Sequence, residues 1–349
     1  ATVARINEPW MAEELIANGK CDMCMIGRPN LCDSEFANKA FEGKVDDIRP
    51  CIGCGRCLTG IMMGKRISWT VNPSVEDDTI APAETKKKVL VIGGGPAGME
   101  AAYVAKKRGH EVVLCEKSNE LGGQLRLAAV PIAKQGLCKV IKFMIRRLDH
   151  EGIEIRLNTE VTKERLENEF KDYEIVCSSG ATPKEIPPFK VFKNWMTADD
   201  VLSGKKYPGR NIVVLGGGSV GCETADYLAP LINDLFPMNR KITLLEMTNN
   251  LMPGEGGAAK SRLTQRLMQK GVRIELNAQV TNVDEESITY VKEGVEHKIT
   301  EADTLIFAVG YAPKKVEVEA ENVHYIGDCE KVGTLKDAIT NAHEIAKNI

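Results

Sequence analysis

The stretch VLVIGGGPAG at residues 89–98 joins an apolar run to three spaced glycines, and IVVLGGGSVG at residues 212–221 repeats the arrangement. Each has a run typical of a buried strand before the glycines and a helix-like sequence after them. In such a unit the first glycine allows the tight turn, the second lets the backbone approach a pyrophosphate, and the third lets helix pack on strand. The helix N-terminus then faces the phosphates. The two stretches therefore predict two dinucleotide sites in an α/β chain.

Each glycine turn is followed by a second apolar run that ends in a carboxylate. The runs EVVLC and KITLL lead to Glu116 and Glu246. A carboxylate at this place accepts hydrogen bonds from the ribose hydroxyls of a bound dinucleotide. No arginine lies directly beside Glu246, and its negative charge would repel a 2′-phosphate. The second site is therefore predicted to prefer NADH over NADPH.

Composition limits the partners and the compartment. The chain has 349 residues, 43% of them hydrophobic, enough for two or more domains. A net charge of −3 gives no electrostatic reason to expect nucleic acid or an anionic membrane as a partner. We find no bilayer-length apolar run and no signal-peptide pattern. Eleven cysteines, an odd number, favour reduced thiols or metal ligands and a cytoplasmic location.

Four further motifs make residues 89–349 resemble the two-dinucleotide flavoprotein reductases. They are LGGQ at 121–124, SGATP at 179–183, VGYAP at 309–313 and the pair Gly327-Asp328. The resemblance implies FAD in the first site and a nicotinamide nucleotide in the second, in two Rossmann-like, glutathione-reductase-like domains. The implied FAD residues are Gly93, Gly95, Ala97, Gly98, Glu116, Lys117, Gly123, Gln124, Val161 and Asp328. The implied nicotinamide residues are Gly216, Gly218, Ser219, Val220, Gly221, Glu223, Glu246 and Gly310, with a surface role for Glu223 left open.

The N-terminal motifs narrow the resemblance. IGRP at 26–29, DIRPCIGC at 47–54 and VNP at 71–73 resemble the junction in the 2,4-dienoyl-CoA reductase, 2-enoate reductase and trimethylamine dehydrogenase group. In that group a TIM barrel like that of Old Yellow Enzyme carries FMN and precedes an iron–sulfur segment. The resemblance implies that Arg5, Gly27 and Arg28 belong to the FMN site. It also places the catalytic residues in a barrel segment or partner chain that this sequence lacks, so none is identified.

The resemblance divides the chain into four parts. Residues 1–48 are expected to form the last two β/α units of the barrel, with strands at 2–6 and 22–26, helices at 9–18 and 34–41, and a loop at 27–29. Residues 49–80 would be the iron–sulfur segment. The FAD domain would be discontinuous, over 81–207 and 306–349, with the nicotinamide domain inserted at 208–305.

The cysteine run departs from the group's pattern. Cys51, Cys54 and Cys57 present three thiols at a spacing suited to a [4Fe–4S] cluster or to zinc. A cubane cluster usually has a fourth thiolate, and the position where the resemblance places it holds Trp69. Six possibilities stay open: a non-cysteine ligand, a three-iron cluster, a ligand from Cys24 or Cys32, an altered residue at 69, a lost cluster, and plain buried thiols. We favour a [4Fe–4S] cluster with altered ligation.

The sequence thus predicts an NADH-dependent oxidoreductase of the enoate or dienoyl-CoA reductase type. Electrons would pass from NADH through FAD, the cluster and FMN to the activated carbon–carbon double bond of an enoate or enoyl-CoA. The alternatives are an electron-transfer subunit without its own substrate site and an amine dehydrogenase-like enzyme. Residues 116–137 lack the cysteine pair of glutathione-reductase-type enzymes, and the inserted domain lacks the pair of thioredoxin reductases. The substrate and the oligomeric state are not specified by the sequence.

Overall fold

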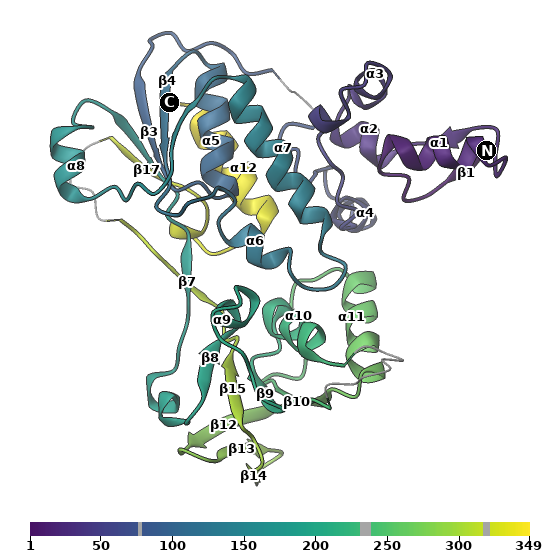
Figure 1. Cartoon of the computed structure of the whole chain (residues 1–349), viewed down its shortest axis with the longest axis vertical. Helices are drawn as coiled ribbons and strands as arrows, with labels where there is room; N and C mark the ends of the chain where they lie inside the picture. Colours follow the sequence, from purple (N-terminus) through teal and green to yellow (C-terminus); the bar gives the residue numbers. More distant parts are fainter. Residues whose placement is uncertain (76–78, 231–238, 317–321) are drawn as a thin grey trace. The chain divides into compact units, whose positions relative to one another are not determined.

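The structure is a computed structural model that describes residues 1–75, 79–230, 239–316 and 322–349. It divides into two compact units, one of residues 1–129, 136–181 and 313–349, the other of residues 130–135 and 182–312 (Figure 1). None of the described helices is long and apolar enough to cross a membrane.

The first unit is built on a five-stranded parallel sheet of order β17-β6-β3-β4-β5. The first glycine turn joins β3 to α5, and β4 ends just before Glu116. β3 lies between β4 and β6. The chain passes from β3 to β4 and β5 on one side, and then crosses to β6 on the other side of β3. The carboxyl end of β3 is therefore the switch point, where open α/β sheets bind ligands. The strands are β3 (Lys88–Ile92), β4 (Glu111–Cys115), β5 (Glu154–Arg156), β6 (Glu174–Cys177) and β17 (Val323–Tyr325).

Helices α5 (Pro96–Lys107), α7 (Gly136–His150) and α12 (Leu335–Ala346) pack together against this sheet. Their apolar faces form one core with the odd-numbered positions of β3. The helix α12 begins at a capping box made by Thr334 and Asp337. The remaining helices of the unit's nucleotide part are α6 (Gln124–Ala128), α8 (Lys163–Asn168) and η3 (Gly327–Cys329).

The N-terminal segment of the first unit contains a parallel β-α-β arrangement. The strands β1 (Thr2–Val3) and β2 (Cys24–Met25) pair in parallel and are joined by α1 (Pro9–Ala17), as expected for the end of a barrel. Both strands are shorter than predicted. Helices α2 (Arg28–Cys32), α3 (Phe36–Phe41), η1 (Val45–Asp47) and α4 (Arg56–Met62) follow. The loop predicted at 27–29 is wrong, because a helix begins at Arg28 with proline in its first turn, where proline's fixed φ is favourable.

The second unit repeats the plan with the parallel sheet β11-β10-β9-β15-β8. The second glycine turn joins β9 to α10. A separate antiparallel sheet, β12-β13-β14, follows β11. The fold predicted as α/β with two Rossmann-like domains is confirmed. The main sheet uses β8 (Trp195–Thr197), β9 (Asn211–Leu215), β10 (Lys241–Leu245), β11 (Arg273–Glu275) and β15 (Thr304–Phe307).

The other elements complete the second unit and the passages between the two. They are η2 (Pro187–Val191), α9 (Ala198–Leu202), α10 (Ser219–Leu228), α11 (Gly257–Gln269), β12 (Ala278–Val283), β13 (Ile288–Lys292), β14 (Val295–Ile299), and the paired strands β7 (Ala181–Pro183) and β16 (Tyr311–Pro313). The strand β8 and helix α9 belong to the second sheet's unit, because β8 pairs with β15. The four-part division drawn from the resemblance stays a prediction.

Candidate cofactor sites

The first glycine turn has the close contacts that its sequence implies. Gly93 has a φ of +102°, in the region that favours glycine. A Cβ on Gly98 would collide with the Gly93 carbonyl oxygen, well inside 3.0 Å, so this position holds helix against turn. A Cβ on Gly95, the N-cap of α5, would meet nothing within 4 Å. Gly95 therefore faces open space at a helix N-terminus, which suits an approaching pyrophosphate.

Glu116 is tied to this turn by both carboxylate oxygens. One oxygen accepts the Gly94 backbone N–H at 2.6 Å, and the other accepts the backbone N–H and hydroxyl of Ser118, both at 2.8 Å. The side chain is buried. Its orientation is thus fixed at the end of β4 before any ligand binds, which fits a ribose acceptor.

The returning Gly327-Asp328 pair lies beside the same turn. Gly327 has a φ of +63°, and a Cβ there would be 2.8 Å from that of Ala97. The Asn341 side chain accepts the Gly327 N–H at 2.9 Å. Burial raises the pKa of Asp328, while an N–H donated by Gly333 opposes that shift. The sequence motifs at 93–98 and 327–328, more than two hundred residues apart, are therefore brought together.

The other predicted FAD residues lie around the same sheet edge. Gly122 donates its N–H to the Gly94 carbonyl at 2.8 Å, which places the LGGQ motif against the first turn. Gly123, with a φ of +52°, is the N-cap of α6. Gln124 donates from Nε2 to the Ala181 carbonyl at 3.0 Å. Val161 packs in the small core on the other face with Cys115, and Lys117 is exposed.

The second glycine turn repeats the first in detail. Gly216 has a φ of +108°, and a Cβ on Gly221 would collide with the Gly216 carbonyl oxygen. Glu246 accepts the Gly217 N–H at 2.6 Å and, on its other oxygen, the N–H and hydroxyl of Thr248 at 2.8 and 2.7 Å. Gly218 faces open space at the N-terminus of α10. The two turns therefore have the same geometry, and in each a carboxylate is held in place by a backbone N–H of the turn.

Other predicted nicotinamide residues lie on α10 or near its start. Ser219 donates to Glu255 at 3.1 Å, Val220 packs at the edge of the unit's core, and Gly310, with a φ of +97°, accepts an N–H from Lys184. Glu223 pairs with Lys134 at 2.6 Å. Burial raises the pKa of Glu223, and Lys134 opposes the shift. The Glu223 side chain is 17% exposed, and its place at the nicotinamide stays a prediction beside the surface role.

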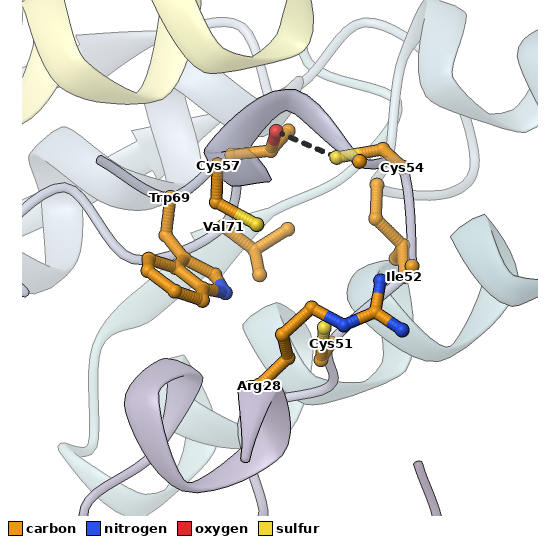
Figure 2. A pocket seen from close by; sticks show the side chains of 10 residues that line it. Arg28, Cys51, Ile52, Cys54, Cys57, Trp69 and Val71 are labelled. Carbon is orange, nitrogen blue, oxygen red and sulfur yellow. Dashed lines mark hydrogen bonds between the residues drawn. The ribbon is translucent and has the colours of Figure 1, made fainter. Parts of the chain in front are cut away.

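The three cysteines of the 51–57 loop surround one small cavity in the first unit. Cys57 is buried, Cys51 is half-buried and Cys54 is exposed. Figure 2 shows their sulfur atoms around a common space, closed by the side chains of Arg28 and Trp69. The Cys54 sulfur lies 3.2 Å from the Thr70 hydroxyl oxygen. The three cysteines that are closely spaced in the sequence therefore line one cavity.

The three thiols do not form a site for a single metal ion. Within residues 1–75, 79–230, 239–316 and 322–349, no three His, Cys, Asp or Glu side chains gather closely enough to hold one metal ion. Thiolates that hold a cubane lie farther apart, on a framework of iron and sulfide. The cavity is only about 10 Å³, with the 5% exposed indole of Trp69 packed against it. A bound cluster thus requires this ring to move aside.

Positive charge lies beside the thiols. Arg28 lines the cavity, and Arg5 reaches to within 3.8 Å of where a Gly53 Cβ would lie. Burial raises the pKa of Cys57, as do the charges of Cys54 and Cys51, while Arg28 opposes the shift. Both predicted FMN-site arginines therefore also border the cysteine loop, where they would balance thiolate charge.

Two Rossmann-like units with paired nucleotide turns define a flavoprotein oxidoreductase with a nicotinamide site. The chain belongs to the pyridine nucleotide-disulphide oxidoreductase family, whose model matches residues 87–330. It is 34% identical to cinnamate reductase of Clostridium sporogenes and 33% identical to NADH oxidase of Thermoanaerobacter brockii, in both cases over the whole of this chain. These matches cover 53% and 55% of those proteins, so the chain spans about half the length of the curated relatives.

A solved structure of 2-naphthoyl-CoA reductase, in complex with 2-naphthoyl-CoA, matches with a TM-score of 0.91 and 27% identity. The match covers 99% of this chain and 53% of that one. The resemblance to the FAD and nicotinamide part of the 2-enoate and dienoyl-CoA reductase group is confirmed.

Proposed function

We propose that this chain is the electron-input part of an NADH-dependent reductase of activated carbon–carbon double bonds, such as those of enoates or enoyl-CoA thioesters. The observation that carries it is the pair of equivalent glycine turns with prepositioned Glu116 and Glu246. The relatives named for reduction of cinnamate and 2-naphthoyl-CoA support the substrate class.

The chain's own residues have distinct roles in this proposal. Gly95 and Gly218 leave the helix N-termini open to a pyrophosphate, and Glu116 and Glu246 hold ribose hydroxyls. Cys51, Cys54 and Cys57 provide thiolates for a [4Fe–4S] cluster. When bound, FAD would supply the chemistry that turns a hydride from NADH into single electrons, and the cluster and FMN would supply a path for those electrons toward the substrate. The residues that orient and protonate substrate would belong to a barrel segment or a partner chain.

The test is a half-reaction that needs no substrate. The chain is reconstituted with FAD, separated from free cofactor, and mixed anaerobically with NADH while flavin absorbance is followed. We expect roughly one FAD per chain, identified by mass after denaturation, and bleaching by NADH. Folded protein that retains no FAD would overturn the assignment of the first site to FAD. Retained FAD that NADH fails to reduce would overturn the proposal that this chain takes electrons from NADH.

Nucleotide choice gives a separate prediction. NADH should reduce the bound flavin with a higher kcat/KM than NADPH, because Glu246 would repel a 2′-phosphate. A contact of this kind discriminates by about 1–3 kcal/mol, hence roughly 5–150-fold. Glu246→Ala should lower the ratio of kcat/KM for NADH to kcat/KM for NADPH. Glu246→Gln is the matched control, because it removes the charge but keeps an acceptor for the Gly217 N–H. Equal rates with both nucleotides in the unmodified chain would contradict the prediction.

A further inference from the structure

A carboxylate lies at the start of α10, the helix that follows the second glycine turn. Ser219, the first residue of that helix, donates its hydroxyl to Glu255 at 3.1 Å. A helix N-terminus favours negative charge, because its first backbone N–H groups have no partners within the helix. Glu255 therefore places an anion at the helix end where the pyrophosphate of a bound dinucleotide is expected.

The segment that carries Glu255 is anchored to the glycine turn a few residues earlier. Met252 donates its backbone N–H to the Gly217 carbonyl at 2.8 Å. A Cβ on Gly217 would lie 2.6 Å from the Leu251 side chain, and both Leu251 and Met252 are buried. Glu255 itself is half-buried, and glycine precedes and follows it. The wide conformational range of these glycines lets the carboxylate swing away while the anchor stays in place.

The first glycine turn makes the same two anchoring contacts and so provides an internal comparison. Gly122 donates its N–H to the Gly94 carbonyl at 2.8 Å. A Cβ on Gly94 would collide with the Leu121 side chain. Leu121 and Gly122 therefore correspond to Leu251 and Met252 of the second turn.

The two turns differ at the position of Glu255. Three residues after its anchor, the first turn has Leu125, which is buried in the core of the first unit. Pro96 begins α5, whereas Ser219 begins α10, and proline has no hydroxyl with which to hold a carboxylate. Of the two turns, only the one predicted to bind the nicotinamide nucleotide thus has this carboxylate and its hydrogen-bond donor.

A second carboxylate lies one turn farther along α10. Burial raises the pKa of Glu223, Lys134 opposes the shift, and the charge of Glu255 raises this pKa further. Glu223 and Glu255 are therefore close enough to repel each other. A pyrophosphate at the start of α10 would add negative charge next to this pair, so Glu255 in its present position would oppose nucleotide binding.

The two predicted cofactors place opposite demands on their sites. The flavin stays bound, whereas the nicotinamide nucleotide binds reduced and leaves oxidised in every turnover, and product release limits many enzymes. We propose that Glu255 is a displaceable anion that occupies the start of α10 in the empty second site and lowers the affinity for the nucleotide, so that the product can leave. This rests on the proposed function, because it requires that the second turn bind a nicotinamide nucleotide.

The experiment compares Glu255→Gln with the unmodified chain and with Glu286→Gln, all loaded with FAD. Glu255→Gln removes the charge but keeps an acceptor for the Ser219 hydroxyl. Glu286→Gln removes the same charge from a side chain of the second unit that is 80% exposed. Calorimetric titration with NAD⁺ gives the dissociation constant at low and at high ionic strength. We expect Glu255→Gln to bind NAD⁺ about 3- to 30-fold more tightly at low ionic strength, and Glu286→Gln to match the unmodified chain.

The dependence on salt separates a charge effect from a change of packing. The gain in Glu255→Gln should shrink as the ionic strength rises, because salt screens the repulsion between the carboxylate and the pyrophosphate. Equal affinities, or weaker binding by Glu255→Gln, would overturn the proposal and leave the second site assigned to the nucleotide. A gain that is the same at high ionic strength would also overturn it. Failure of the unmodified chain to bind NAD⁺ would overturn the second site and the role of Glu255 together.

Discussion

Gly98→Ala and Gly95→Ala should both strongly weaken FAD binding, but only Gly98→Ala should also destabilise the fold. A Cβ at position 98 would collide with the Gly93 carbonyl and with the Ser178 hydroxyl, which itself donates to Ile92 and Gly93. Backbone cannot move here without displacing the end of β3. Overpacking of this kind costs about 3 kcal/mol, the upper part of its usual range.

Gly95→Ala is the matched variant, three residues away in the same turn. Its φ of −73° suits alanine, and the new methyl group would meet no protein atom within 4 Å. The methyl group would instead occupy the approach of the pyrophosphate, which weakens FAD binding by at least about 100-fold, or about 2.7 kcal/mol. Thermal unfolding of the apoprotein and fluorescence titration with FAD measure the two effects. Tight FAD binding by Gly95→Ala would show that the pyrophosphate lies elsewhere.

The sequence predicts the nucleotide turns well because their determinants are local. Strand, glycines, helix and carboxylate follow one another along the chain, from residue 88 to 116 and from residue 211 to 246. The last glycine of each turn avoids a collision with the carbonyl of the first, five residues earlier. The hydrogen bonds of Glu116 to Ser118 and of Glu246 to Thr248 follow the same logic, since a hydroxyl two residues after each acid is visible in the sequence.

The parts that sequence reasoning missed depend on contacts between distant segments. Lys134 reaches Glu223 from another part of the chain, and Asn341 supports Gly327 from α12. No periodicity marks either side chain. Cys24 and Cys32 were both open as further ligands, and neither of them is among the residues that line the cavity of the cysteine loop. The helix at Arg28–Cys32 was also missed, although proline in a first turn is a helix signal.

Glu100→Ala should be the most destabilising single change in the first unit. Glu100 is buried on α5, two residues after Gly98, and pairs with Arg147 of α7 and with His343 of α12, the latter at 2.9 Å. The Arg147 side chain is 10% exposed, and its guanidinium lies over the Tyr103 ring at 3.8 Å. Removing the carboxylate leaves this guanidinium without its counter-charge, and breaking a buried pair in this way costs about 3–5 kcal/mol.

The same carboxylate makes the unit sensitive to acid. Burial alone would raise the pKa of Glu100, but the charge of Arg147 and the hydrogen bonds from His343 and Arg147 outweigh it and lower the pKa to about 2. A carboxylate with a depressed pKa stabilises the fold fully above its unfolded pKa of about 4.5. This stabilisation, of the order of 3 kcal/mol, is lost as the pH falls from about 4.5 towards 2.

The exposed pair Lys107–Glu151 is the matched control, because it too joins the end of α5 to the end of α7, at 3.3 Å. Its groups are 42% and 28% exposed, so Glu151→Ala should change stability by less than about 1 kcal/mol. Urea unfolding of the three proteins between pH 7 and pH 3 measures the difference. The free energy of unfolding of the unmodified chain and of Glu151→Ala should fall in parallel with acid, whereas Glu100→Ala should start lower and fall less. If Glu100→Ala and Glu151→Ala lowered the free energy of unfolding equally at pH 7, the contacts of Glu100 with Arg147 and His343 would not be what holds α5, α7 and α12 together.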